Sequence, residues 1–516
     1  MNRFHSFQIL KRFSRPLWSA NWSVSRCSSS SSPNNEKLLS MSDIPGPRGL
    51  PILGSTIDYL RALDKSYLLL FERVKKYGGI YKEKMLAGMP YSVIVTDTSD
   101  IETVFRADGK YPIRPDTPMS LDMRDALKIP YGLLLSSNEE WYRQRQSISP
   151  FMMVPRKVAE QHIGFNDISD DLVSAIRKVR SSDASVISDV PSLLFKWSFE
   201  SVSYTTLGKK LGSLNIDNVP KKCQDMIDNT QLLFQKTLEA MFTPPLYKIY
   251  PTKLWKDLLR SQKQVYDISM SFVEERVKEI ESQSQQVNES DEAPEKMDFL
   301  TYMLLSNKLT KEEITSNAVD LMFAGIDTTS YTLTWTLHNL ATNIDIQERV
   351  REELHSVMGS DNLVTPEHIQ KMTILRNCVK ESLRLYPTVP MNIRALQQDV
   401  VLSGYSVPAG TQVLIPIIVI ARMEKYFPNQ PNSFIPDRWN REGEYPKNPF
   451  AFLPFGFGAR MCIGRRVAEL ELHIAIAKIL KNFNVSYATG PDTKMDFVMK
   501  LVIVPEKQLD LVFSDI

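Results

Sequence analysis

The sequence predicts a mainly α-helical protein with small β-sheets, folded as one large domain. Apolar residues recur at helical spacing over most of the chain, most clearly in residues 65–77, 99–107, 138–148, 164–178 and 261–280. Short strand-like runs stand at residues 79–85, 91–96, 402–407, 411–415 and 499–505. The hydrophobic content of 43% is enough for a large core. No long polar linker divides the chain after about residue 45, so we interpret the acidic segment 281–295 as an exposed loop of that domain.

The first 35 residues differ in composition from the rest of the chain. They hold five basic residues, a serine run at 28–32 and no acidic residue. Such a segment is typical of a mitochondrial transit peptide, with a disordered basic tail as the alternative, and it is too polar to span a bilayer. We therefore predict a transit peptide over residues 1–35 and the folded domain over residues 36–516. The net charge of only +2 argues against a nucleic-acid-binding protein.

One of the four cysteines, Cys462, stands in the glycine-rich segment F-G-F-G-A-R-M-C-I-G, residues 455–464. This segment predicts a haem-thiolate loop, because a thiolate on haem iron must be deprotonated, shielded and tuned by nearby donors. Gly456 and Gly458 allow positive φ and N–H groups directed at the sulfur. The other predicted contacts are Phe455 over the sulfur, Arg460 at a haem propionate and Gly464 against the macrocycle. The alternative is a buried structural cysteine.

The loop resembles the haem-binding signature of the cytochromes P-450, F-x-x-G-x-R-x-C-x-G, and fills every specified position. The resemblance extends over most of the chain, from the proline-rich residues 45–49 onward. It implies a single haem-thiolate domain that binds haem b, which is iron protoporphyrin IX. It also implies a monooxygenase that uses O2 to hydroxylate a lipophilic substrate.

A long helix is predicted over residues 310–343, with a T-x-x-E capping box at its start. Its middle is A-G-I-D-T-T, residues 324–329. These residues are poor helix formers, so we expect them to loosen the backbone where something lies against it. A solvated helix face is the alternative. By the resemblance, Thr328 orients the oxygen and its waters, and Asp327 relays protons.

A structural clamp is predicted before the haem loop. Glu381 and Arg384 form E-x-x-R on a predicted helix, residues 375–385, and they share one face of it. Arg438 in F-I-P-D-R-W matches the arginine that joins this pair in the family. We interpret the three residues as a clamp that holds the haem loop and takes no part in catalysis.

Three further residues match haem contacts of the family. Trp141 and Arg145 form W-x-x-x-R on a predicted helix, and Arg394 precedes a strand. By the resemblance they bind the propionates, whose two negative charges call for fixed cations in an apolar pocket. Taken alone, each arginine would also suit the surface. Candidate residues of the substrate pocket are Phe323, Val389 and Leu501.

Two pairs of cations resemble the mitochondrial branch of the family, which accepts electrons from an acidic ferredoxin. Arg465 and Arg466 follow the haem loop directly in C-x-G-R-R-x-A-E. Arg376 and Lys380, four residues apart, match the pair that docks ferredoxin, with arginine at 376 where lysine is common. The implied partners are a [2Fe–2S] ferredoxin and its NADPH-dependent reductase. A solvated basic face is the alternative.

The segment 242–254 is apolar, aromatic and basic at once, which suits a membrane interface. With the N-terminal segment, it predicts a peripheral protein on the matrix side of the mitochondrial inner membrane. We expect a monooxygenase acting on a steroid-like or xenobiotic substrate. The alternatives are a haem-thiolate isomerase or dehydratase, an endoplasmic-reticulum monooxygenase fed by a flavoprotein reductase, and a haem sensor.

Overall fold

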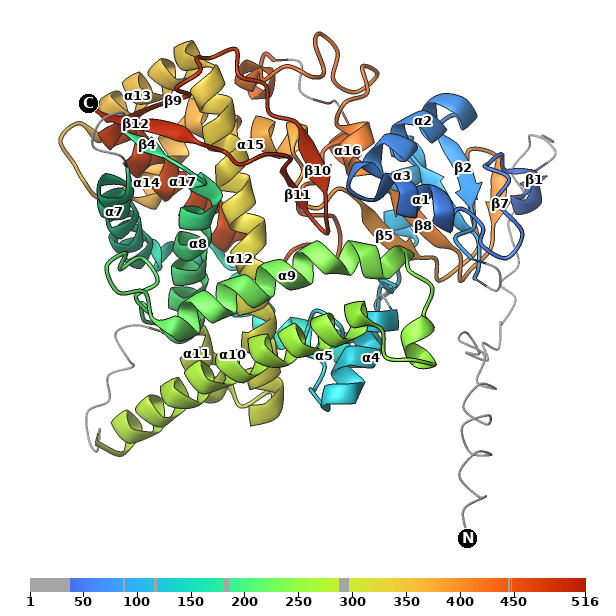
Figure 1. Ribbon diagram of the computed structural model, residues 1–516, viewed down its shortest axis with the longest axis horizontal. Helices are drawn as coiled ribbons and strands as arrows, with labels where there is room; N and C mark the ends of the chain where they lie inside the picture. Colours follow the sequence, from blue (N-terminus) through green and yellow to red (C-terminus); the bar gives the residue numbers. More distant parts are fainter. Residues whose placement is uncertain are drawn as a thin grey trace. The chain divides into compact units, whose positions relative to one another are not determined.

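Long helices make up most of the structure, and α12 (Lys311–Thr342) runs through the middle of them (Figure 1). In the computed structural model the described residues are 38–86, 89–115, 118–180, 185–286, 297–443, 446 and 448–516. Of the chain, Leu39–Ile516 form one compact unit. The predicted transit peptide, residues 1–35, lies outside the described residues.

The expected mainly α-helical fold is confirmed. Besides α12, the α-helices are α1 (Thr56–Ala62), α2 (Tyr67–Tyr77), α3 (Thr98–Arg106), α4 (Pro118–Leu127), α5 (Asn138–Met152), α6 (Pro155–Ala159), α7 (His162–Val179), α8 (Val190–Leu207), α9 (Lys221–Phe242), α10 (Lys253–Gln286), α11 (Phe299–Ser306), α13 (Ile344–Met358), α14 (Pro366–Lys371), α15 (Thr373–Leu385), α16 (Ile417–Ile420) and α17 (Arg465–Asn482). Helix α10 is longer than predicted. It includes the first part of the segment that we expected to be a loop, and residues 287–295 of that segment lie outside the described residues.

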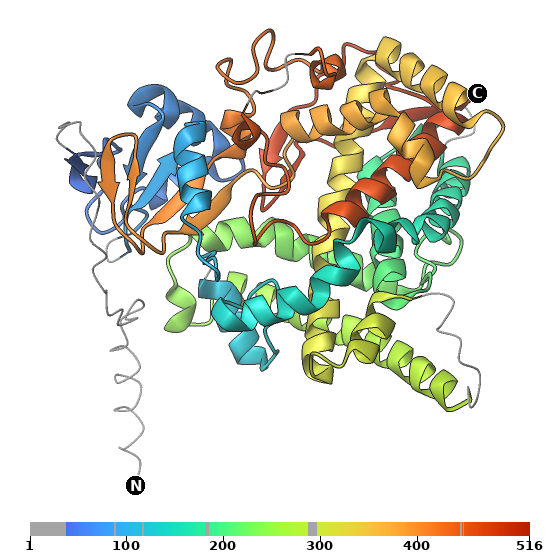
Figure 2. The same ribbon diagram turned by 180° about the vertical axis from the view of Figure 1, so that it is seen from behind.

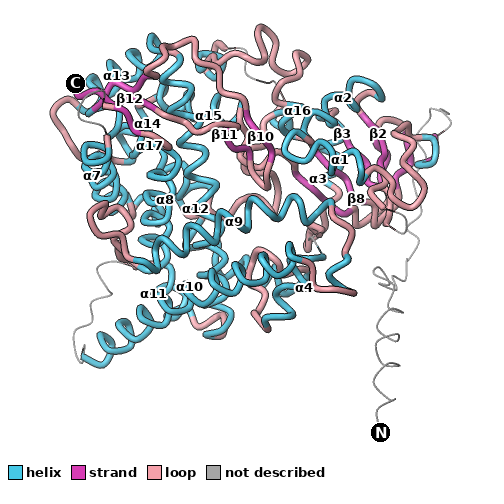
Figure 3. The backbone as a smooth tube through the Cα atoms, viewed as in Figure 1, coloured by secondary structure: helices cyan, strands magenta, loops and turns pink. Residues whose placement is uncertain are grey.

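Within the described residues the strands form four small sheets. Figure 3 shows the strands in magenta. They are β1 (Leu39–Ser40), β2 (Ile80–Glu83), β3 (Ser92–Val95), β4 (Val186–Ile187), β5 (Asn392–Ala395), β6 (Val400–Leu402), β7 (Tyr405–Val407), β8 (Gln412–Ile415), β9 (Phe483–Ser486), β10 (Phe497–Met499), β11 (Ile503–Pro505) and β12 (Leu511–Asp515). The largest sheet has the order β2-β3-β8-β5, with β3 and β8 parallel and the other neighbours antiparallel. The remaining sheets have the orders β1-β7-β6, β4-β12-β9 and β10-β11.

The two segments 402–407 and 499–505, each predicted as one strand, belong to hairpins of two strands, so these predictions are wrong. In the first, Ser403 and Gly404 separate β6 from β7. Both have positive φ, at 46° and 82°, which is the backbone of a two-residue type I′ turn. In the second, residues 500–502 separate β10 from β11, which pair antiparallel. The glycine at 404 was the available signal for the first turn.

Helix α12 begins as predicted and then packs tightly on α8. Thr310 N donates to Glu313 Oε2 over 2.8 Å, and Glu313 N donates to the Thr310 hydroxyl, which completes the capping box. The expected loosening at residues 324–329 is wrong, because α12 is helical without a break. A side chain at Gly325 would instead place its Cβ 2.7 Å from Val202 Cγ2 on α8. The glycine is therefore explained by the close approach of the two helices, whose neighbouring positions are also seen from behind in Figure 2.

Candidate active site

The segment around Cys462 is a tight loop that ends on the first turn of α17. Cys462 N donates to Phe455 O over 2.9 Å, and Gly456 and Gly458 have φ of 70° and 75°, so their predicted positive φ is confirmed. The expected direction of the glycine N–H groups is wrong for Gly456, which donates to Leu453 O. The Cys462 sulfur instead accepts from the N–H groups of the residues after it, at the start of α17. These groups have no partner within the helix, which makes them available to the sulfur.

The Cys462 sulfur faces an internal recess. Its side chain is exposed by surface area, yet the surrounding protein is dense enough for burial to raise the pKa of the thiol. The N–H groups of Gly464 and Arg465 and the charges of Arg145 and Arg465 act in the opposite direction and lower that pKa. A Cβ atom at Gly464 would meet no described atom within 4 Å. Open space next to a sulfur donor is what a flat metal-bearing ligand requires.

Several of the predicted propionate ligands gather around one carboxylate. The Arg460 guanidinium lies 4.0 Å from the ring centre of the buried Trp141, and its Nε donates to the backbone. Arg394 Nε pairs with Asp108 Oδ2 over 2.9 Å, with both side chains buried. The charges of Arg394 and Arg460 both act on Asp108, so these residues lie close together. Arg394 and Arg460 therefore bring positive charge to the region around Asp108.

Two further residues of this region escaped the sequence analysis. Arg114 donates to Leu134 O over 2.6 Å. Burial lowers the pKa of Arg394, and the charge of Arg114 lowers it further. Asn392 precedes Arg394 by two residues on β5, so the two side chains point to the same face. Its buried Nδ2 has no hydrogen-bond partner within the described chain. The alternation along β5 was the signal that could have found Asn392.

Ala324, Gly325 and Thr328 form a half-buried stripe on α12. The Thr328 hydroxyl donates to Ala324 O over 2.8 Å, which fixes its position one turn back along the helix. On the neighbouring helix, the Ser198 hydroxyl donates to the carbonyls of Gly325 and Ile326 over 2.9 and 2.8 Å. These bonds hold the polar centre of α12 in place against α8.

Asp327 is a buried acid without a charged partner. Only 2% of its surface is exposed, and its Oδ1 has no hydrogen-bond partner among the described residues. Burial raises its pKa to about 8, so the carboxyl carries a proton at neutral pH. An acid in this state can give up a proton and take one back near the working pH.

The three predicted clamp residues meet in the core. Arg384 donates to both carboxylate oxygens of Glu381 over 2.8 Å each, and Arg438 Nε donates to Glu381 Oε1 over 3.1 Å. Trp439 Nε1 adds a fourth donor at 2.9 Å. At most 2% of each charged side chain in the trio is exposed. The clamp thus joins α15 to the segment that leads into the Cys462 loop.

Comparison with known proteins agrees with this arrangement. A family model described as Cytochrome P450 matches residues 44–513. The chain belongs to the cytochrome P450 family. Relatives include cytochrome P450 10 of Lymnaea stagnalis, 31% identical over 91% of this chain and 85% of that protein. Mitochondrial sterol 26-hydroxylase of Homo sapiens is 29% identical over 90% and 88%, and the probable mitochondrial cytochrome P450 12a5 of Drosophila melanogaster is 32% identical over 85% and 84%.

The predicted family and enzyme class are confirmed. Cytochromes P450 are haem-thiolate proteins, so haem is the cofactor, and this chain is a monooxygenase. The sulfur donor, the open space at Gly464, the arginines near Asp108 and the Asn392 Nδ2, which has no hydrogen-bond partner among the described residues, all fit such a group. Several relatives are mitochondrial enzymes. None of the helices within the described ranges has the length and apolar character needed to cross a membrane.

The four predicted docking cations of this cytochrome P450 lie along α15 and at the start of α17. Burial lowers the pKa of Lys380, and the nearby charges of Arg376 and Arg465 lower it further, so the three cations are close together. Arg465 pairs with Glu469 over 2.9 Å, and Arg466 is exposed. Arg376 and Lys380 are half-buried, so the structure shows a basic patch with partly sheltered cations rather than a fully solvated face.

The predicted interfacial segment 242–254 is partly exposed. Leu246, Ile249 and Tyr250 are 55%, 80% and 70% exposed. Phe242 is buried and stacks on Tyr59, so it does not contribute to the exposed part of the segment. The aromatic ring of Tyr247 also turns inward, and its hydroxyl donates to Asp122 on α4 over 2.7 Å.

The predicted substrate-pocket residues lie on three different elements. Phe323 on α12 packs on Phe234 of α9, with ring centres 5.0 Å apart. Leu501, between β10 and β11, donates its N–H to Phe234 O over 3.2 Å, so these two predicted residues share a neighbour. Val389 is 43% exposed. All of these side chains are apolar.

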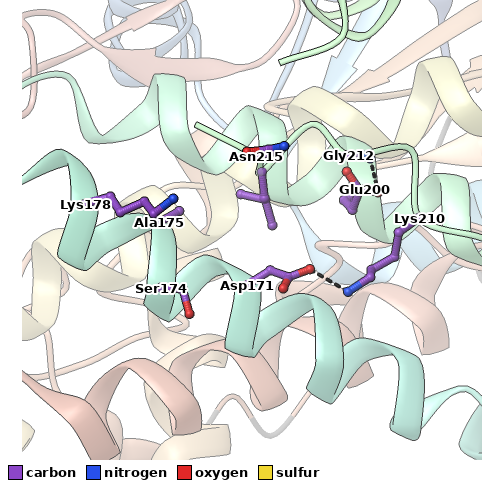
Figure 4. Close-up of a pocket in the computed structure, with 9 residues that line it drawn as sticks. Asp171, Ser174, Ala175, Lys178, Glu200, Lys210, Gly212 and Asn215 are labelled. Atoms are coloured by element: carbon purple, nitrogen blue, oxygen red, sulfur yellow. Dashed lines mark hydrogen bonds and ion pairs between the residues drawn. The ribbon is translucent and has the colours of Figure 1, made fainter. Parts of the chain in front are cut away.

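A separate pocket lies between α7, α8 and the loop at 210–215 (Figure 4). Lys210 pairs there with Asp171 over 2.6 Å, and Glu200 accepts the N–H groups of Gly212 and Ser213. Because internal partners satisfy these charged groups, we assign this pocket no part in the active site.

The clamp generates a prediction about stability. Replacing Arg384→Met should lower the free energy of unfolding by about 3–5 kcal/mol, because it leaves a fully buried carboxylate with fewer donors. Arg349→Met is the matched control, since Arg349 pairs with Asp437 at the surface and should cost at most about 1 kcal/mol. Denaturant unfolding measures both. Equal losses in the two variants would contradict the assignment.

Proposed function

We propose that Cys462 is the axial thiolate ligand of the haem iron. The observation that carries this assignment is the position of its sulfur, which faces a recess and accepts two N–H groups at the start of α17. These donors and the two arginine charges stabilise the thiolate form against the effect of burial. When bound, the haem supplies the redox chemistry that activates O2.

Cations and neutral hydrogen-bond donors around the recess would hold the haem propionates. Trp141, Arg145, Arg394 and Arg460 take this role as the sequence predicts, and we add Arg114 and Asn392 on the basis of their positions. Phe455 would cover the sulfur, as the sequence predicts, and its ring centre lies 5.5 Å from the Arg465 guanidinium. Gly464 would leave room for the macrocycle.

Proton supply would fall to Asp327 and Thr328. Asp327 holds a proton at neutral pH in a buried place, and the Thr328 hydroxyl lies on the half-buried stripe of α12. A hydroxyl and a neutral carboxyl can order water molecules and pass protons along them. The clamp of Glu381, Arg384 and Arg438 would keep the loop in place without taking part in the chemistry.

The substrate would be lipophilic and steroid-like or a xenobiotic. The apolar character of Phe234, Phe323 and Leu501 supports this, as does the similarity to sterol 26-hydroxylase, whose name states a sterol substrate. Electrons would come from NADPH through a ferredoxin reductase and a [2Fe–2S] ferredoxin. The mitochondrial relatives and the basic patch on α15 and α17 support that route.

The thiolate ligand is tested by Cys462→His. The variant should lose the strongly red-shifted Soret band of the reduced carbon monoxide complex, because that band requires a thiolate donor. Cys378→Ala is the control, since Cys378 is a buried thiol elsewhere and should leave the band intact. Persistence of the band in Cys462→His would overturn the assignment.

The proton-supply role predicts a loss of coupling. In Thr328→Ala and Asp327→Asn, less of the NADPH consumed should appear as product, while substrate binding is retained. Wild-type coupling should also decline as pH rises through about 8, because Asp327 then loses its proton, and Asp327→Asn should lack this decline. Thr336→Ala is the matched control, because its buried hydroxyl also bonds one turn back on α12. Unchanged coupling in both test variants would remove the role.

The docking patch predicts an electrostatic defect. Arg376→Glu with Lys380→Glu should weaken ferredoxin binding and slow haem reduction, because an acidic partner is then repelled. Substrate affinity should stay at the wild-type level. The control is Arg260→Glu with Lys263→Glu, a pair of exposed cations on α10. If ferredoxin-supported turnover is unchanged in the variant with Arg376→Glu and Lys380→Glu, the docking site lies elsewhere.

We also propose that residues 1–35 direct the protein to mitochondria and that Leu246, Ile249 and Tyr250 rest on the inner membrane. A reporter carrying residues 1–35 should enter mitochondria, and delivery to the endoplasmic reticulum would refute the targeting. Ile249→Glu should reduce cosedimentation with lipid vesicles, because it places a charge on the exposed apolar tip. Unchanged cosedimentation would refute the membrane contact.

A further inference from the structure

A stack of two aromatic rings lies on the face of α12 that carries Thr328. Trp335 follows Thr328 by two helical turns, which is about 10 Å along the axis. Its indole is only 1% exposed and lies flat on the ring of Tyr386, with centres 3.8 Å apart and planes within 2°. The indole Nε1 donates to Ile503 O over 3.1 Å, which fixes the ring in place. The stack is therefore rigid and close to the proposed oxygen site.

A histidine and a tyrosine continue this stack. The His338 ring lies 5.6 Å from that of Trp335 and 6.0 Å from that of Tyr386. Its Nδ1 is 2.8 Å from the Tyr487 hydroxyl. Burial lowers the pKa of His338 to about 4, so the ring is neutral at physiological pH and has a nitrogen that can accept a proton. Tyr487 follows β9 in the chain and is 7% exposed.

We propose that Trp335, Tyr386, His338 and Tyr487 form an electron relay that protects the haem site. This inference rests on the proposed haem site. The relay would act when an oxidising equivalent, formed from O2 by the monooxygenase activity, is not consumed by substrate. Core packing alone would be served by aliphatic side chains. The four residues are instead types that can lose an electron or accept a proton, and they form continuous contacts.

Electrons and protons balance in two stages. Trp335 gives one electron to the oxidised haem site, and Tyr487 gives one electron to Trp335 while its hydroxyl proton moves to His338 Nδ1. Tyr386 shares the charge of the oxidised indole through the flat stack. A small thiolate in the surrounding solution then returns one electron to Tyr487, and His338 returns the proton. Two oxidised thiols combine as a disulfide, so the relay ends in its starting state.

The test is freeze-quench electron paramagnetic resonance on the holoenzyme after mixing with an organic peracid, without substrate or thiol. The wild type should show a tyrosyl radical. Trp335→Phe and Tyr487→Phe should each lose the tyrosyl radical. Trp335→Phe removes the residue that gives its electron to the haem site, and Tyr487→Phe removes the tyrosine that carries the radical. Trp197→Phe should retain it, since Trp197 is an equally buried tryptophan on α8. The two variants that lose the radical should also lose haem absorbance faster under peracid, and added thiol should protect only the wild type and the control.

Two results would overturn the relay. One is a radical of unchanged yield in both Trp335→Phe and Tyr487→Phe. The other is a wild type that shows the thiolate carbon monoxide band but no tyrosyl radical. If Trp335→Phe fails to fold, Tyr487→Phe decides alone. A wild type without the thiolate band would refute the proposed haem site itself, and the relay with it, so the two failures are distinguishable.

Discussion

The buried carboxylate of Glu381 is the interaction on which the active site depends. A charge with no exposed surface is tolerated only where donors surround it, and Arg384, Arg438 and Trp439 supply them. Through these contacts α15 is tied to the segment before the Cys462 loop. The same helix carries Arg376 and Lys380, and the Lys380 ammonium lies 5.9 Å from the ring centre of Trp439. One buried anion therefore sets the relative position of the thiolate loop and the proposed docking patch.

Environment decides the role of each cysteine and each acid. Burial raises the pKa of Cys378 and of Cys462 alike, but only Cys462 has helix N–H groups directed at its sulfur. Burial is also the largest influence on Asp108 and Asp327. Asp108 forms an ion pair with Arg394. Burial raises the pKa of Asp327, and no cation among the described residues opposes this effect, so Asp327 keeps its proton. The residue type alone distinguishes neither Cys378 from Cys462 nor Asp108 from Asp327.

The sequence could predict what spacing determines. The loop glycines, the capping box of α12 and the E-x-x-R pair each depend on local geometry, and each was located from residue order. Arg114 could not be found this way, because it approaches Arg394 only where Ile113 bridges to Ala395 on β5, far along the chain. The meaning of Gly325 was missed for the same reason, since it depends on Val202 of another helix. Contacts between segments that are far apart in the sequence cannot be predicted from a local pattern of residues.

The clamp has a consequence for inherited variation. Glu381, Arg384 and Arg438 lie in the core, where they bond to one another, to Trp439 and to nearby backbone carbonyls. Substitutions there would act on how much folded enzyme a cell retains, because chaperones and proteases remove destabilised chains. The amount of folded enzyme in a cell would then fall with the stability that each substitution removes.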